Sequence, residues 1–284
     1  MSAAPDDVPN DASDEVPDDA PPNAAAPAPG GGWRPRDCHA HTTWSDGALT
    51  PAALAGVVLE RGVKPTVADH CSRDVGLAVK DADTFRRYLA ALEAVRAQHP
   101  ELALSGEFCW HDAMWRDLPT ALWARLDHAV GSLHAIHLAD GTRVHMFARH
   151  WPRDLAVDAY MDAHVADLER FAREMPVDVL AHPTLLPLPL RGRPLEELWT
   201  EAREERAVAA LAAAGIAFEV SNRYRPHERF VRRAVEGGVR LSLGSDGHAP
   251  QAVGDVAWPL DVARRCGARD EDLYDPAVHG RRSA

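Results

Sequence analysis

The chain has 284 residues, a hydrophobic content of 46% and a formal net charge of -12 at pH 7. This length exceeds that of most small single domains but is ordinary for an α/β barrel. No run of about 18 apolar residues occurs, so we expect no membrane span. Stable binding of duplex nucleic acid requires a basic face, and the acidic balance therefore argues against such a partner.

The first 32 residues differ from the rest in composition. They contain seven acidic residues and no Lys or Arg, and they are rich in Pro and Ala. With few large apolar side chains, such a segment cannot bury enough surface to offset the entropy of ordering. It also lacks the basic start and apolar core of a signal peptide. We predict a disordered acidic tail over residues 1–32 and one catalytic domain over residues 33–284.

Taken in chain order after the tail, apolar runs alternate with helical patterns. The expected strands are a short one leading to His39, followed by residues 63–70, 101–108, 127–134, 177–183, 216–222 and 239–248. The expected helices cover residues 51–62, 81–98, 118–126, 157–174, 195–215, 227–238 and 251–267. Thr50 and Pro51 suit the start of the first helix, Gly215 suits the end of the fifth, and Pro259 predicts a break in the last. A loop of about twenty residues follows the fourth strand.

Seven strand–helix units predict a parallel sheet with right-handed crossovers. The sheet is either open and doubly wound or closed as a barrel. Nearly every expected strand ends with a His, Asp or Glu. The strand ends of a barrel converge on one mouth, whereas an open sheet brings together only the ends near its switch point. The polar strand ends therefore favour a barrel.

The stretch RDCHAHTTWSDG suggests what these polar ends do. In an extended strand His39 and His41 point to the same face, and two converging imidazoles suit a divalent metal. Each polar residue alone has a structural explanation, as a core histidine or a turn residue. Together they form a set of candidate metal ligands: His39, His41, Asp46, His70, Glu107, His134, His182, Asp246 and His248. At such density, buried acids and histidines would repel or stay unpaired without cations.

These residues resemble the motifs of the polymerase and histidinol phosphatase (PHP) family of metal-dependent phosphoesterases. The opening CHAHTTWSDGALTP is similar to the family's first motif, and VADHCS, SGEF, GSLH, LAHP and LGSDGHAPQAVG follow in the family's order. The resemblance spans roughly residues 36–265. It implies an α/β fold of the PHP type, a distorted seven-stranded (β/α)7 barrel, which agrees with the count of strand–helix units.

The resemblance also implies three metal positions. One takes His39, His41, Glu107 and Asp246; a second shares Glu107 and adds His134 and His182; a third takes Asp46, His70 and His248. We therefore expect two to three divalent ions. Ligands rich in nitrogen favour Zn, Mn or Fe over Mg.

The expected activity is hydrolysis of a small phosphomonoester by a metal-activated hydroxide, with Glu107, Asp246 and His248 as catalytic residues. Histidinol phosphate is the family's best-known substrate, although AHPTLLPLPLRGR after the fifth strand differs from what we expect of histidinol phosphatases. Two alternatives stay open. One is a nucleotide or short-oligonucleotide phosphoesterase or 3′-exonuclease, and the other is a non-catalytic metal-binding interaction module.

Two further expectations concern the substrate and the compartment. Arg191 and Arg223 are candidate substrate-binding residues, because a guanidinium pairs well with phosphate, although solvated loop arginines are the alternative. The four cysteines, Cys38, Cys71, Cys109 and Cys266, form no CxxC pair. We interpret them as buried packing residues in a reduced, cytoplasmic setting.

Overall fold

The computed structural model describes residues 33–76 and 78–282, so the acidic tail predicted over residues 1–32 lies outside the described residues. The centre of the described structure is a six-stranded sheet in which every neighbouring pair of strands is parallel. The strand order is β10 (Leu241–Gly244), β9 (Ala217–Ser221), β8 (Val179–Leu180), β5 (Val130–Ser132), β4 (Glu107–Cys109) and β2 (His70–Cys71). The mixed α/β class and the parallel sheet expected from the alternating pattern are confirmed.

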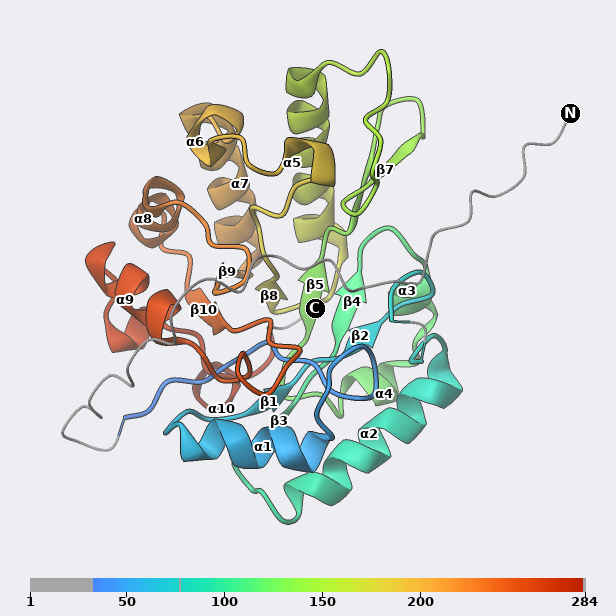
Figure 1. The fold of residues 1–284 in the computed structure, drawn as a ribbon, viewed down its shortest axis with the longest axis vertical. Helices are drawn as coiled ribbons and strands as arrows, with labels where there is room; N and C mark the ends of the chain where they lie inside the picture. The colour runs from blue at the N-terminus through green and yellow to red at the C-terminus, as the bar shows by residue number, and fades with distance from the viewer. Residues whose placement is uncertain (1–32, 77, 283–284) are drawn as a thin grey trace, which may run out of the picture.

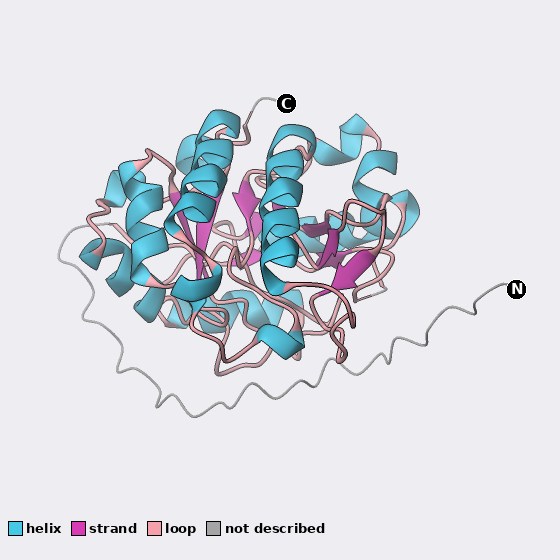
Figure 2. Ribbon diagram, turned by 90° about the horizontal axis from the view of Figure 1, so that it is seen from above, coloured by secondary structure: helices cyan, strands magenta, loops and turns pink. Residues whose placement is uncertain are grey.

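Helices surround the strands on the outside (Figures 1 and 2). The longer ones are α1 (Pro51–Glu60), α2 (Ala82–Arg96), α5 (Val157–Glu174), α7 (Glu201–Ala214), α8 (Glu228–Glu236) and α9 (Ala257–Arg265). The Thr50 side chain caps α1 as predicted, and Gly215 ends α7 in the left-handed conformation that glycine adopts without strain. No helix within residues 33–76 and 78–282 is long and apolar enough to cross a bilayer.

Two of the expected strands are each divided into short pieces. The expected strand 63–70 contains β1 (Thr66–Val67) and the start of β2, and the expected strand 101–108 contains β3 (Ala103–Leu104) and the start of β4. β1 and β3 pair as a separate two-stranded parallel sheet. The Ser105 N–H donates to the Val67 carbonyl, and the Glu107 N–H donates to the Asp69 carbonyl. These hydrogen bonds continue the parallel pairing from β1 and β3 to β2 and β4.

The strand expected before His39 is not a regular strand. Residues 36–40 make only isolated parallel bridges, Arg36 with Lys64 and Ala40 with Gly247. A side chain takes the place of some of the backbone hydrogen bonds that a regular strand would make here. The buried Asp37 carboxylate accepts the backbone N–H groups of Ser245 and Gly254. The segment still contacts both edges of the sheet. The Cys38 N–H donates to the Leu243 carbonyl (2.8 Å), and the Ala68 N–H donates to the Ala40 carbonyl (2.9 Å).

Three helix predictions need correction. The expected helix 118–126 is only the single turn α4 (Thr120–Trp123), preceded by α3 (Met114–Asp117). The expected helix 195–215 divides into α6 (Leu195–Leu198) and α7, because the fully buried Trp199 leaves helical geometry to pack against Phe230. The expected helix 251–267 begins only at Ala257. Pro259 lies in its first turn, where the missing N–H breaks no helical hydrogen bond, so it does not interrupt the helix.

The loop expected after the fourth strand contains an antiparallel hairpin, β6 (Ala135–His137) and β7 (Arg143–His145). The turn passes through Gly141, whose φ of 85° is one that glycine adopts readily. The remaining short elements are η1 (Leu188–Leu190), η2 (Asp270–Asp272) and α10 (Pro276–His279).

The apolar residues form two buried groups. The large one lies between the strands and the helices and includes Phe108, Phe218 and Phe230. The small one brings together mostly small side chains from the segment before His39 and from several strands: Cys38, Ala68, Val130, Val179, Ala181, Ala217 and Tyr274. All four cysteines are buried and free, as the packing interpretation expects.

The packing over β5 leaves no room for a side chain at Gly131. A Cβ atom there would lie 2.7 Å from two atoms of the Phe171 ring and 2.8 Å from Val177. We predict that Gly131→Ala lowers the free energy of unfolding by about 1–3 kcal/mol, measured by urea denaturation, because the core must shift to admit a methyl group.

Gly56 in α1 is the matched control, since a Cβ there meets nothing within 4 Å. Gly56→Ala should raise stability by about 0.5–1 kcal/mol through helix propensity. Equal stabilities of the Gly131→Ala variant and the wild type would contradict this description of the core.

Candidate metal centre

The nine predicted ligands gather at the carboxyl ends of the strands. His70 and Glu107 lie on β2 and β4, the short pieces that follow β1 and β3, while His134, His182 and Asp246 follow β5, β8 and β10 by two residues. His39 belongs to the segment 36–40, His41 and Asp46 follow that segment, and His248 follows β10. Because parallel strands end at the same side of a sheet, segments distant in sequence deliver their side chains to one place.

His39, His41, Glu107 and Asp246 form the first group. The two histidine Nε2 atoms are 3.1 Å apart, and the Glu107 Oε2 atom lies 3.6 Å from His39 Nε2 and 3.8 Å from His41 Nε2. Asp246 Oδ1 is 3.9 Å from His39 Nε2 and 3.2 Å from His41 Nε2. Ligands about 2.0–2.2 Å from a tetrahedral zinc ion are about 3.3–3.6 Å apart, so the spacing of this group suits a metal.

Glu107 also belongs to a second group, through its other oxygen. Its Oε1 atom lies 3.1 Å from His182 Nε2 and 3.4 Å from His134 Nε2. The Oε2 atom, besides facing the first group, is 2.5 Å from His70 Nδ1, but neither of those two atoms makes a hydrogen bond of acceptable geometry. The fully buried Glu107 carboxylate thus stands between two sets of imidazoles, as a carboxylate that bridges two ions would.

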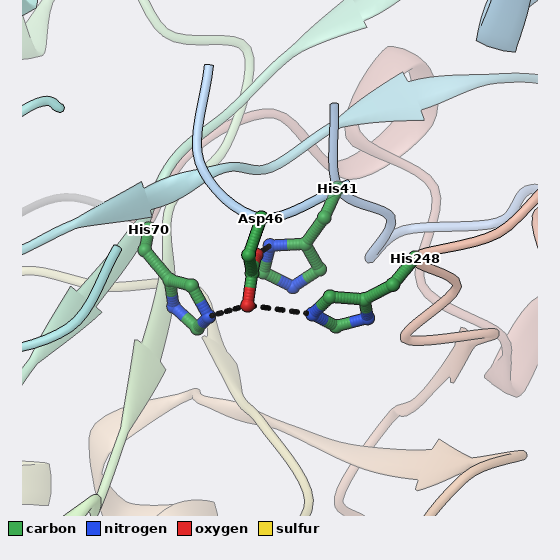
Figure 3. Close-up of side chains that lie close together, drawn as sticks. All are labelled: His41, Asp46, His70 and His248. Atoms are coloured by element: carbon green, nitrogen blue, oxygen red, sulfur yellow. Dashed lines mark ion pairs between the residues drawn. The ribbon is translucent and has the colours of Figure 1, made fainter. Parts of the chain in front are cut away.

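The third group surrounds Asp46 (Figure 3). Its Oδ2 atom lies 3.3 Å from His248 Nε2 and 3.6 Å from His70 Nε2, and its Oδ1 atom lies 3.6 Å from His41 Nδ1. The resemblance implied Asp46, His70 and His248 for this position, and the structure adds His41 to them. His41 faces the first group with one ring nitrogen and the third with the other.

Several buried polar atoms of these groups have no hydrogen-bond partner in the described part of the chain. They include Asp46 Oδ1, His70 Nδ1 and Glu107 Oε2. An unpaired buried polar atom costs about 1–3 kcal/mol, and more when it is charged. All three atoms face other ligand-capable atoms. The residues therefore fit divalent cations, which would satisfy them together.

The backbone is strained at two of the ligands. Among the described residues other than glycine, positive φ occurs at His182 (30°) and Asp246 (50°). Residues with a side chain rarely adopt this region, and such strain persists only where the surrounding structure imposes it. The fold therefore holds both side chains in orientations that an ordinary strand end would not give.

Protonation inside the cluster is uneven. Burial, together with the neighbouring His248 and His70, lowers the pKa of His41 to about 3. Burial disfavours a charged Glu107, but the surrounding imidazoles outweigh it and hold the pKa of Glu107 well below its usual range. Burial disfavours the charged forms of His39 and His70, but the neighbouring carboxylates outweigh it and hold the pKa of each well above its usual value. A neutral imidazole and an ionised carboxylate are the forms that bind metals, so cations that bind here would displace the protons of these two histidines.

Glu219 on β9 positions two of the ligands. Its Oε1 atom accepts a hydrogen bond from His39 Nδ1 (2.8 Å), which leaves His39 Nε2 facing the first group. Its Oε2 atom accepts the backbone N–H of His182 (2.6 Å). A side chain at Gly244 on the neighbouring strand would collide with this carboxylate, so a glycine is required there. Carboxylates behind metal-binding histidines fix the tautomer and ring orientation in this way.

Two buried aspartates fix the loops that carry the acidic ligands. Asp69 accepts hydrogen bonds from the Thr42 N–H, the Thr42 hydroxyl and the Ser45 hydroxyl, each at 2.7 Å, and so holds the turn that leads to Asp46. Asp37 accepts the Ser245 N–H (2.9 Å) and hydroxyl (2.6 Å), directly before Asp246. Burial raises the pKa of Asp37 to about 6, in spite of these donors.

The two predicted substrate-binding arginines differ in their distance from the cluster. Arg223 Nη1 lies 2.7 Å from His248 Nδ1, so its guanidinium is at the third group. Arg191 is bound to the carbonyls of Leu186 and Met146 and lies over the Tyr224 ring (5.7 Å), with none of the nine ligands among these contacts. The Tyr224 ring is in turn 5.4 Å from the His182 ring, so Tyr224 contacts both Arg191 and a residue of the cluster.

The residues behind the ligands were not predicted from the sequence. Glu219 lies within the apolar run IAFEVSN, and Asp69 lies within VKPTVADH. An acidic residue inside a strand that is otherwise apolar is a usable signal, because burial of an unpaired carboxylate is costly. Its partner cannot be identified from one sequence, since Glu219 and His39 are 180 positions apart.

Comparison with known proteins supports the fold. No family model matches the chain, and no curated protein matches it in sequence. Among solved structures, histidinol phosphate phosphatase from Lactococcus lactis, complexed with zinc, L-histidinol and phosphate, gives a TM-score of 0.62. The identity is 11%, over 83% of this chain and 95% of that chain. The two proteins therefore share a fold.

A second solved structure, a provisionally assigned metal-dependent phosphoesterase from Bifidobacterium adolescentis, gives a TM-score of 0.35 at 14% identity. The match covers 84% of this chain and 99% of that chain. A score that low does not establish a common fold.

The position of Glu219 generates a prediction for metal affinity. We predict that Glu219→Gln weakens zinc binding by about 10–100-fold, because the amide no longer fixes the His39 ring as a carboxylate does. Competition with a chromophoric chelator measures the affinity. Glu236→Gln, at the exposed end of α8, is the control and should leave zinc affinity unchanged. Equal affinities of the Glu219→Gln variant and the wild type would show that Glu219 does not support the metal site.

Proposed function

We propose that this protein is a metal-dependent phosphoesterase that hydrolyses a small phosphomonoester. The observation that carries the proposal is the Glu107 carboxylate, which is fully buried between two sets of imidazoles and has one oxygen with no hydrogen-bond partner among the described residues. A dinuclear cation site bridged by a carboxylate is suited to phosphate ester hydrolysis. The fold shared with a zinc-containing phosphatase supports the same assignment.

We also propose that the strands form the distorted seven-stranded barrel expected from the sequence. Hydrogen bonds join the segment before His39 to β10 on one side and to residues 64–68 on the other, which supports closure. The small buried cluster also supports it, because Cys38 and Val179 belong to segments that are not neighbours in the sheet. Closure would explain how six segments deliver ligands to one mouth.

The nine ligands would hold two or three ions of Zn, Mn or Fe, and His41 would serve two of the groups. Such ions, when bound, lower the pKa of water and offset the charge of a phosphate ester. The residues around the ligands hold them in position. Glu219, Asp37 and Asp69 fix the orientations of the ligands or of the loops that carry them, and seven of the nine ligands are buried away from bulk water.

Arg223 is placed to orient the phosphate. Its guanidinium lies beside His248 at the third group, and a guanidinium pairs with phosphate oxygens in a fork. His248 Nδ1 also lies 2.8 Å from the Asp246 carbonyl. A carbonyl only accepts and a guanidinium only donates, so Nδ1 satisfies one of them at a time. When Nδ1 donates to Asp246, Nε2 is free to bind a metal and Arg223 is free for the substrate.

The proposed substrate is small, and the proposed setting is a reduced, cytoplasmic one. A net charge of -12 opposes the approach of a long polyanion, and this argues against polymeric nucleic acid. Four buried free cysteines agree with a reducing compartment.

We predict that His39→Ala and Asp246→Asn each lower hydrolysis of an aryl phosphate by at least about a thousandfold, because each removes a ligand from the first group. Initial rates with the zinc-loaded or manganese-loaded protein measure the loss, and circular dichroism checks the fold. The exposed His150→Ala variant is the control and should retain full activity. Full activity of either ligand variant would refute the proposed function.

A further inference from the structure

A cavity of about 200 Å³ lies beside the candidate metal centre, between the segment after β8 and the segment after β9. Its walls are largely apolar and include Leu185, Leu186, Leu190 and Leu195. Three of these leucines are almost fully buried, so they are parts of the folded core and not of a mobile surface. A space of this size holds a group comparable to one aromatic ring or a short alkyl chain.

One wall of the cavity also contacts the metal centre. Tyr224 lines the cavity, and its ring lies 5.4 Å from the ring of His182, a ligand of the second group. Thr184, another lining residue, follows His182 by two positions and donates a hydrogen bond to the Tyr224 carbonyl (3.0 Å). None of the nine ligands lines the cavity itself. Tyr224 is therefore a wall that the cavity shares with the metal centre, and a molecule held at the metal centre that reaches beyond this one ring would enter the cavity.

The charge of the cavity is positive, although the chain as a whole is acidic. Arg191, Arg193 and Arg225 line it, and within residues 33–76 and 78–282 no acidic residue lines it. Arg191 and Arg225 are held in place, since Arg191 is bound to backbone carbonyls and Arg225 is bound to Asn222 and lies over the Trp258 ring. The exposed Arg193 guanidinium makes no hydrogen bond or ion pair with any described residue, so its donors are available to a ligand.

We infer that this cavity receives the organic part of the substrate, an apolar or aromatic group of about one ring that carries a second anion facing Arg193. The inference rests on the proposed function, and it names the substrate class. It also separates this protein from its structural neighbour, which was solved with L-histidinol. The amine of histidinol is a cation at neutral pH, and this cavity offers it three cations and no carboxylate.

The first experiment compares hydrolysis of three phosphomonoesters by the zinc-loaded full chain. The probes are 4-carboxyphenyl phosphate, with a second anion, phenyl phosphate, with none, and histidinol phosphate, with a cation. The expected order of kcat/KM is 4-carboxyphenyl phosphate, then phenyl phosphate, then histidinol phosphate. A preference for histidinol phosphate over both aryl esters would overturn the inference.

The second experiment reverses the charge of Arg193, the side chain that we infer to face the second anion. Arg193→Glu should lower kcat/KM for 4-carboxyphenyl phosphate by about tenfold, mainly through KM, since a charge-assisted contact is replaced by repulsion. It should change kcat/KM for phenyl phosphate by less than about twofold. Arg87→Glu is the matched control and should alter neither value. Arg87 is exposed on α2, and α2 lies far from α6, the short helix that begins just after Arg193 (Figure 1). Equal effects of Arg193→Glu on both esters would also overturn the inference.

A binding measurement separates the failure of this inference from the failure of the proposed function. Calorimetry with the non-hydrolysable phenylphosphonate and 4-carboxyphenylphosphonate reports recognition without turnover. Tighter binding of the carboxylated compound, lost in Arg193→Glu, would support the cavity assignment even if no ester were hydrolysed, and only the proposed function would then fall. Hydrolysis of aryl phosphates with equal binding of both phosphonates would leave the function standing and refute the cavity assignment.

Discussion

The arrangement of the site depends on one electrostatic constraint: a carboxylate is fully buried among imidazoles, away from bulk solvent. Glu107 has no exposed surface, and the histidines around it come from segments both before and after β4 in the chain. Removing such groups from water costs several kcal/mol for each charge unless opposite charges are held close in good geometry. Divalent cations satisfy a dense set of nitrogen and oxygen ligands more completely than the ligands satisfy one another.

The surrounding fold is consistent with this requirement. Glu219, Asp37 and Asp69 are buried behind the ligands and accept hydrogen bonds from them or from the loops that carry them. These buried acids limit the movement of the candidate ligands, and high metal affinity requires ligands that are held in place. The strained backbone at His182 and Asp246 belongs to the same arrangement, because each residue is held where a strand has just ended. Positioning therefore comes from three buried acids, one on β9 and two in the segments that lead to the ligands.

The sequence predicted the alternation of strands and helices, because hydrophobic period and caps are local properties. Thr50 and Gly215, for example, mark helix ends in the structure. It did not predict the break at Trp199 or the hairpin β6–β7, since packing against Phe230 and pairing across a turn are tertiary events. The predicted ligands lie together at the strand ends. Their supporting acids were missed because their partners are far away in sequence, as with Glu219 and His39, and the apolar cavity beside Tyr224 gave no local pattern at all.

The most direct test of the metal cluster is a crystal structure of the zinc-loaded protein with anomalous scattering measured on both sides of the zinc absorption edge. We expect at least two zinc peaks, one of them between His39, His41, Glu107 and Asp246, with Glu107 contacting two ions. Absence of zinc from this site, with the imidazoles and carboxylates bonded to one another or to water instead, would contradict this expectation.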